Sequence, residues 1–384
     1  MNEPTRLPRI PRRTALLATG AILLMVAACG QAAVTAPTSA PTRAATQAGA
    51  TLPGASAGGP AQPGQASAAG PATAPTASPS AGSSAGGTFP GGFLVADRGN
   101  GRILAIDRTG RIWWRFPTAG ALPAGQAFAA DDAFLAPDGR TIVANDETHE
   151  VIDRIDAATG RITWQYGHYG RAGSGAGFLH TPDDAYPLAN GDIVVADIEN
   201  CRVIEINPAK QIVRQWGRTG ACTAAAPATF GRPNGDTPLP GGGILITEIT
   251  GSRVVRLAAD GHVVFDIHVP VRYPSDAQLD SAGNVIVADY SNPGSVVRVS
   301  PTGKLLWRYG PTTGAGRLDH PSLATPLADG TILINDDFRH RLVIVDPATN
   351  TIVWQYGTTD RPGQTANHLN VPDGHEPLPA GISF

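Results

Sequence analysis

Acidic and amide side chains recur at matching positions of a pattern that repeats from about residue 90 to the C-terminus. The first column of this pattern consists of Asp131, Asp183, Asn234, Ser275, Ser322 and Asp373. The second column, one residue later, holds Asp132, Asp184, Gly235, Asp276, Leu323 and Gly374, and the next position adds Asp236 and His375. Carboxylates that met on one axis would repel one another unless water or a cation separated them, and Ca²⁺ takes six to eight oxygen ligands of these kinds. Two hypotheses follow: a water-filled acidic funnel, or a Ca²⁺ site with the ligands Asp131, Asp183, Asn234 and Asp373.

Histidines and arginines depart from the repeat near the C-terminus. They lie in the segments 319–320, 336–341 and 373–376, and they include His320, Arg339, His340 and His375. A histidine beside a carboxylate could act as a general base, and an arginine could bind an anionic substrate. The alternative is that each histidine is a surface or turn residue.

A third set of polar residues closes short apolar segments. It consists of Asp97, Asn145, Asp197, Glu248, Asp289 and Asp336. Arginines follow shortly after most of them, at positions 102, 202, 253 and 341. Asp and Asn at strand ends commonly accept N–H groups of the following turn. We therefore expect these residues to hold turns rather than ligands.

The elements that position these side chains are short strands. Residues 181–217 contain four apolar or alternating segments separated by turns, and the segment 193–197 is rich in β-branched residues, as a buried strand should be. Similar units recur at intervals of 41 to 52 residues. Four-stranded repeats with such periods are typical of a β-propeller. The first repeat lacks its first strand, and residues 373–378 at the C-terminus supply it. The sequence therefore predicts six blades in a closed ring. The alternative is that residues 380–384 begin one further strand.

The N-terminal part has a different composition. Residues 1–28 combine arginines with an apolar run of signal-peptide length, and they end in Val-Ala-Ala before Cys29, which resembles the lipobox of bacterial lipoproteins. The alternative is an ordinary secretory signal, and Arg12-Arg13 leaves the export route open. Residues 29–90 are rich in Ala, Pro, Ser, Thr and Gly, which predicts a tether. The expected organisation is therefore a signal peptide (1–28), a lipidated Cys29 with its tether (29–90) and a propeller (91–384).

The other two cysteines fall in one repeat. Cys201 follows the second strand, and Cys222 lies in the loop after the fourth strand. Both loops leave the same face of a propeller, and an exported protein reaches an oxidising compartment. We predict a structural disulfide between them.

Family resemblances appear in the strand motifs. Residues 156–164, DAATGRITW, resemble the tryptophan-docking repeat of pyrroloquinoline-quinone-type (PQQ-like) propellers, and residues 346–354 resemble it with two departures. Residues 95–103, VADRGNGRI, resemble NHL repeats. The quinone enzymes usually have eight blades and adjacent cysteines, which this chain lacks. The resemblance therefore implies the fold, with tryptophans that lock neighbouring blades.

The carboxylate columns also resemble six-bladed lactone hydrolases, which hold a channel Ca²⁺ with Asp, Asn and Glu. That likeness implies an alternative function, a Ca²⁺-dependent hydrolase with His375 or His320 as base. A quinone-dependent or group-transfer enzyme is a weaker alternative. The net charge of −3 and the absence of a basic cluster argue against nucleic acid as a partner. We expect a monomeric, lipid-anchored extracytoplasmic module that binds a protein or a small molecule. No cofactor is firmly indicated, and Ca²⁺ is the one candidate.

Overall fold

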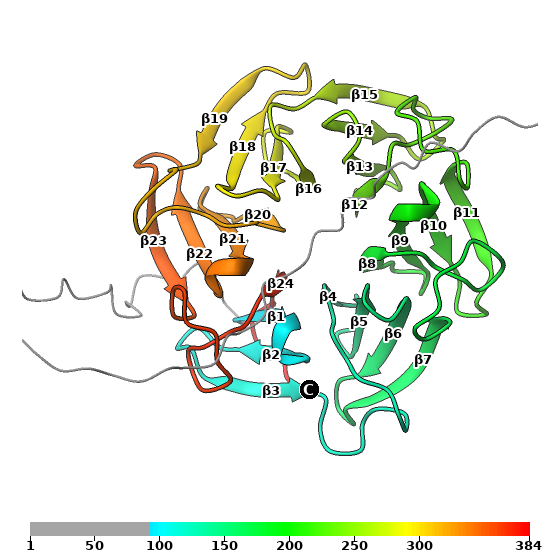
Figure 1. The fold of residues 1–384 in the computed structure, drawn as a ribbon, viewed down its shortest axis with the longest axis vertical. Coiled ribbons are helices and arrows are strands. Elements are labelled where there is room, and N and C mark those ends of the chain that lie inside the picture. Colours follow the sequence, from blue (N-terminus) through cyan, green and yellow to red (C-terminus); the bar gives the residue numbers. More distant parts are fainter. Residues whose placement is uncertain (1–91) are drawn as a thin grey trace, which may run out of the picture. The chain divides into compact units, whose positions relative to one another are not determined.

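The computed structural model describes residues 92–384, whose strands form six four-stranded antiparallel sheets around a central axis (Figure 1). In blade 1, the C-terminal strand β24 (Pro372–Pro377) pairs with β1 (Phe93–Asp97), which is followed by β2 (Arg102–Ile106) and β3 (Ile112–Phe116). The six-bladed propeller and its closure by the last strand are thus confirmed. Residues 380–384 form no further strand.

The other five blades follow in chain order, and the first strand of each lies nearest the axis (Figure 1). Blade 2 is β4 (Ala133–Leu135), β5 (Thr141–Asp146), β6 (Val151–Asp156) and β7 (Arg161–Gly167), and blade 3 is β8 (Pro182–Pro187), β9 (Ile193–Asp197), β10 (Arg202–Ile206) and β11 (Ile212–Gly217). Blade 4 is β12 (Pro233–Pro238), β13 (Ile244–Glu248), β14 (Arg253–Leu257) and β15 (Val263–His268). Blade 5 is β16 (Pro274–Leu279), β17 (Val285–Asp289), β18 (Ser295–Val299) and β19 (Leu305–Tyr309), and blade 6 is β20 (Ala324–Pro326), β21 (Ile332–Asp336), β22 (Arg341–Asp346) and β23 (Thr351–Tyr356).

The hydrophobic core lies between blades. Six apolar clusters each join two neighbouring blades, as where Val143 and Ile152 of blade 2 pack with Ile204 of blade 3. Indole N–H groups tie the same interfaces. Trp114 donates to the carbonyl of Ala157 at 2.8 Å, Trp164 to that of Pro208 at 3.0 Å, and Trp307 to the side chain of Asn350 at 3.1 Å. Each acceptor belongs to the next blade, so the tryptophans lock blade to blade as the PQQ-like resemblance implies.

The turn-holding interpretation is confirmed for Asp97, Asp197, Asp289 and Asp336. Glu248 makes an ion pair with Arg253 but no hydrogen bond among the described residues, and the blade 2 position needs a correction of register. Asp97, Asp197 and Asp336 accept from the Nε of the arginine five residues later, at 2.6–2.7 Å. In blade 2, however, the residue that closes the second strand is Asp146, which pairs with Val151 across the turn, and the choice of Asn145 was wrong by one position. Asp146 accepts the N–H of Ala129, as Asp97 accepts that of Asn370. The Asn145 side chain instead donates to the carbonyl of Pro182 in the next blade.

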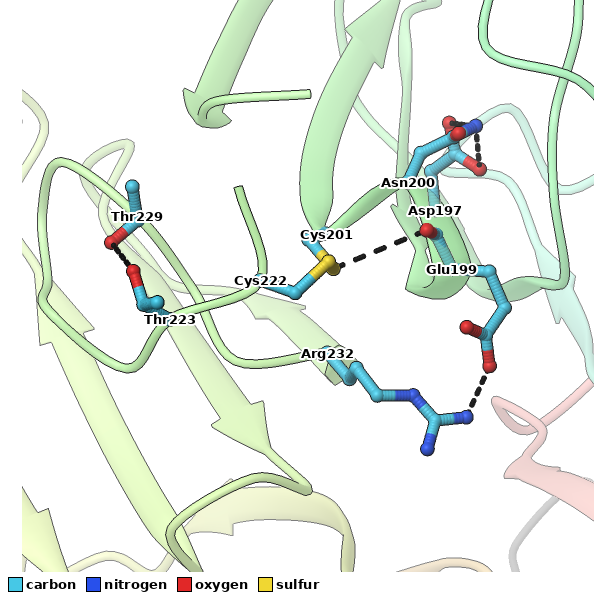
Figure 2. The surroundings of a disulfide bond; sticks show 8 residues. All are labelled: Asp197, Glu199, Asn200, Cys201, Cys222, Thr223, Thr229 and Arg232. Carbon is cyan, nitrogen blue, oxygen red and sulfur yellow. Dashed lines mark hydrogen bonds and ion pairs between the residues drawn. A yellow bond between two sulfur atoms is a disulfide. The ribbon is translucent and has the colours of Figure 1, made fainter. Parts of the chain in front are cut away.

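The predicted disulfide is confirmed. Cys201 and Cys222 are bonded, with their Cα atoms 5.1 Å apart, and Figure 2 shows the bond joining the loop after β11 to the turn after β9. An ion pair between Glu199 and Arg232 lies beside it. The signal segment, Cys29 and the tether lie outside the described residues. Within residues 92–384, none of the helices has the length and apolarity needed to cross a membrane.

Candidate functional site

The first-column residues lie at the beginnings of the innermost strands. Asp183 is in β8 and Asn234 is in β12, while Asp131 lies two residues before the short strand β4. Antiparallel pairing places the end of each second strand beside these positions, as where Pro182 pairs with Asp197. One face of the propeller, which we call the channel mouth, therefore carries both the first column and the residue that follows each second strand.

Arg98 is the residue of the mouth that sequence reasoning missed. Its guanidinium pairs with Asp131, with Asp373 at 2.9 Å and with Glu147 at 2.8 Å. Burial opposes its charge, but Asp131 and then Asp373 together raise the pKa of Arg98 above its ordinary value. Two of the four predicted Ca²⁺ ligands are therefore already paired with a cation of the chain.

A sequence signal for Arg98 exists once the register of blade 2 is corrected. The residues that directly follow the strand-closing positions are Arg98, Glu147, Ile198, Ile249, Tyr290 and Asp337. Structural positions repeat their residue type from blade to blade, and this set does not. Its variability marks the positions at which the mouth is specialised.

Deeper in the channel, second-column carboxylates gather. Ligand oxygens of Asp132, Asp183 and Asp184 all lie within 4.8 Å of one another. Among the described residues, one oxygen of Asp184 and both oxygens of Asp236 are buried without a hydrogen-bond partner. Desolvation first, and the neighbouring carboxylates second, raise the pKa of Asp132 to about 8 and those of Asp184 and Asp236 well above the ordinary range. Asp276 also lies here, and its pKa is raised by burial.

The Asn234 amide joins this cluster to the mouth. Its Nδ2 donates to Asp183, and its Oδ1 accepts from the hydroxyl of Tyr273 at 2.9 Å. Asn234 therefore orients the Asp183 carboxylate, and its own oxygen is engaged.

An aromatic arc borders the mouth on blades 5 and 6. It consists of Tyr273, Tyr290, His320 and Phe338, whose successive ring centroids are 5.4, 4.9 and 4.8 Å apart. The Phe338 side chain is 47% exposed. Next to it, Asp337 is fully buried, and one of its oxygens accepts from Ser322 at 2.9 Å while the other has no partner among residues 92–384. Burial and then the charge of Asp337 raise the pKa of Tyr290.

The structure does not bring the three predicted histidines together. His375 is buried, with Nδ1 against Asn335 and Nε2 2.9 Å from the Thr325 hydroxyl, and desolvation lowers its pKa to about 3. His340 closes a turn at φ +58°, and its Nδ1 accepts the N–H of Val371. His320 alone lies at the mouth, with Nδ1 2.7 Å from an oxygen of Asp319.

Arg339, the predicted anion-binding residue, is engaged within the fold. Its guanidinium pairs with Asp360 at 3.0 Å and donates to the carbonyls of Gly314, Ala315 and Arg317. These contacts hold two loops together and occupy its donors.

Comparison with known proteins identifies the repeat. A family model described as outer membrane protein assembly factor BamB matches residues 64–212 and 211–374. Among solved structures, the chain is similar to a protein of unknown function from Bacteroides caccae, with 18% identity and a TM-score of 0.53 over 74% of this chain and 97% of that one. It is also similar to a chain of the nidogen/laminin complex, with 13% identity and a TM-score of 0.51 over 74% and 96% of the two chains. No curated protein matches. At these identities the structural matches show the propeller fold alone.

Proposed function

The chain belongs to the family of PQQ-like propellers described as outer membrane protein assembly factor BamB, and from that premise we propose that it is an extracytoplasmic binding module whose ligand site is the channel mouth. The proposed ligand is a positively charged segment of a partner protein. The observation that carries this proposal is the position of the aromatic arc beside the unpaired carboxylate oxygen of Asp337.

Charge and ring chemistry together support this class of ligand. Aromatic faces attract Lys and Arg side chains within about 6 Å of the ring centroid, and a buried carboxylate without a partner lowers its free energy by accepting from a cation. Phe338 is exposed at the rim, and Tyr290, on the other side of His320 in the arc, lies where the charges of Asp337, Asp373 and Asp131 act on its hydroxyl. A lysine or arginine that crossed the arc would therefore meet carboxylates on its far side.

The proposed location agrees with the rest of the chain. A lipid on Cys29 and a tether over residues 29–90 would hold the propeller at the outer face of a membrane. The Cys201–Cys222 disulfide supports an oxidising compartment, because such bonds are rare in the cytosol.

Site-specific photo-crosslinking in cells tests the proposal, with a photoreactive residue at Phe338 in one variant and at Val264 in another. The two positions are matched, since both side chains are apolar and they are 47% and 46% exposed, but Val264 lies on the outermost strand of blade 4. We expect a defined protein adduct at position 338 that weakens several-fold with Asp337→Asn and with high salt. Equal adducts at both positions, or an adduct insensitive to charge, would contradict the proposal.

A second candidate function is metal-assisted hydrolysis, favoured by one observation. The Asp319–His320 pair resembles the orienting hydrogen bond that prepares a histidine for base catalysis, and it lies at the mouth. A lactone panel assayed with Ca²⁺ and with EDTA tests it. The hydrolase would be supported if turnover is abolished by EDTA and by His320→Ala but is kept in His368→Ala, a variant in an exposed loop. Absence of turnover would leave the binding module.

A further inference from the structure

We propose that Asp132, Asp183 and Asp184 hold a Ca²⁺ ion in the deep part of the channel, below the mouth. This site differs from the set predicted from the first column, because Arg98 pairs with Asp131 and Asp373. It also goes beyond the proposed function, since its three ligands are not the residues expected to contact a partner.

The chemistry of the cluster selects a hard cation. Its members offer only carboxylate oxygens, which Ca²⁺ and Mg²⁺ prefer, and no His or Cys belongs to the group. Oxygens on opposite sides of Ca²⁺ are about 4.6–5.2 Å apart, twice the metal–oxygen distance, whereas Mg²⁺ allows only about 4.2 Å. The three ligand atoms all lie within 4.8 Å of one another, close enough for one such ion to contact all of them. Mg²⁺ usually keeps several waters and binds through one or two carboxylates, so a site of three carboxylates suits Ca²⁺ better.

Unpartnered buried oxygens are the second observation that indicates an ion. Asp184 is 3% exposed and Asp236 is fully buried, and three of their four carboxylate oxygens lack a partner among the described residues. Within residues 92–384 no Lys, Arg or His forms an ion pair with Asp132, Asp183 or Asp184. Ionising carboxylates that are buried together without a countercharge is costly, and a divalent cation removes that cost.

Two glycines show that space is reserved for these carboxylates. A Cβ at Gly374 would lie 2.1 Å from an oxygen of Asp132, and a Cβ at Gly235 would lie 2.7 Å from an oxygen of Asp276. The second column thus places a glycine where the neighbouring blade sends in an aspartate. Because Asp132 belongs to blade 2 and Asp183 and Asp184 belong to blade 3, the ion would join the two blades at the axis.

Thermal unfolding of the purified full-length chain tests the site, first with EDTA and then with added CaCl₂ or MgCl₂. We expect Ca²⁺ at about a hundred times its Kd to raise Tm by roughly 5 °C, and Mg²⁺ to raise it less. Asp184→Asn should lose most of this rise. Because that substitution also relieves repulsion, its Tm in EDTA should equal or exceed that of the wild type, which separates ligand loss from misfolding.

A matched control is Asp153→Asn. Asp153 is a carboxylate in β6 that is also 3% exposed, but it accepts from Gln165 and lies outside the cluster. This variant should keep the full Ca²⁺ response. An unchanged response in both Asp184→Asn and Asp132→Asn, or no response of the wild type, would overturn the proposal.

Terbium luminescence gives a readout that does not depend on stability. Tb³⁺ occupies Ca²⁺ sites and emits when a nearby tyrosine transfers energy to it. Tyr186 is half-buried, and the charges of Asp276, Asp184 and Asp132 act on its hydroxyl. We expect Tb³⁺ emission that disappears when Ca²⁺ displaces the Tb³⁺. The Tyr186→Phe variant should weaken this emission several-fold. Emission that Asp184→Asn leaves unchanged would place the ion elsewhere. If position 338 gives no crosslink while the Ca²⁺ response is intact, the proposed function is refuted but the Ca²⁺ site is not.

Discussion

Arg98→Met tests whether one guanidinium holds the channel mouth together. Methionine is unbranched, as arginine is, but carries no charge. The substitution therefore leaves Asp131, Asp373 and Glu147 facing one another without a cation. Removing one partner of a buried ion pair costs about 3–5 kcal/mol. The Arg98 side chain is 25% exposed while those of Asp131 and Asp373 are 3% and 11% exposed, so we expect the lower end, about 3 kcal/mol. For a domain of this size that is roughly 6–9 °C in Tm.

The assay is thermal and urea unfolding of wild type, Arg98→Met, Arg98→Lys and Arg98→Met with Asp131→Asn. The Lys variant should lose less, because it keeps a charge but cannot contact three carboxylates through one planar fork. Burial and the charges of Glu147 and Asp373 raise the pKa of Asp131, so protonation should reduce the cost of Arg98→Met as the pH falls. This account would be refuted if Arg98→Met unfolds at the wild-type midpoint, or if adding Asp131→Asn to Arg98→Met restores no stability.

Three further predictions concern stability. Burial raises the pKa of Glu376 to about 7 from its ordinary 4.5, so the contribution of Glu376 to the free energy of unfolding is fully present below about pH 4.5 and is lost as the pH rises through about 7. Glu376→Gln should remove up to about 3 kcal/mol of this pH dependence, and equal slopes of wild type and variant in a plot of stability against pH would contradict the prediction. Reduction of the disulfide between Cys201 and Cys222, which are 21 residues apart, should lower the free energy of unfolding by about 3 kcal/mol. An unchanged urea midpoint in dithiothreitol would show that the disulfide does not stabilise the fold. Trp164→Phe should cost about 1–3 kcal/mol because the carbonyl of Pro208 in the next blade loses its donor, whereas Trp113→Phe, for which no such bond is present among the described residues, should cost less by thermal unfolding.

Much of the fold could be predicted from the sequence because its causes are local and repeat six times. Apolar second strands such as residues 193–197, tryptophans at the fourth strands and turns at regular intervals leave few arrangements other than a ring of sheets. The closing strand followed from the one incomplete repeat. The disulfide followed from two loops of a single blade, whose separation depends little on the rest of the ring.

Only the tertiary structure decided which polar side chains meet. β5 contains six residues where the second strands of the other blades contain five, so the pattern places Asn145 where Asp146 closes the strand, which hid the position of Glu147. Arg98 reaches Asp373, 275 residues away in the chain, because ring closure brings the two ends together. The sequence pattern indicates His375 as a candidate base, but packing places it between Asn335 and Thr325. A repeat determines which residues face the axis, but side-chain direction, burial and contacts across blades determine which of them pair and which remain without a partner.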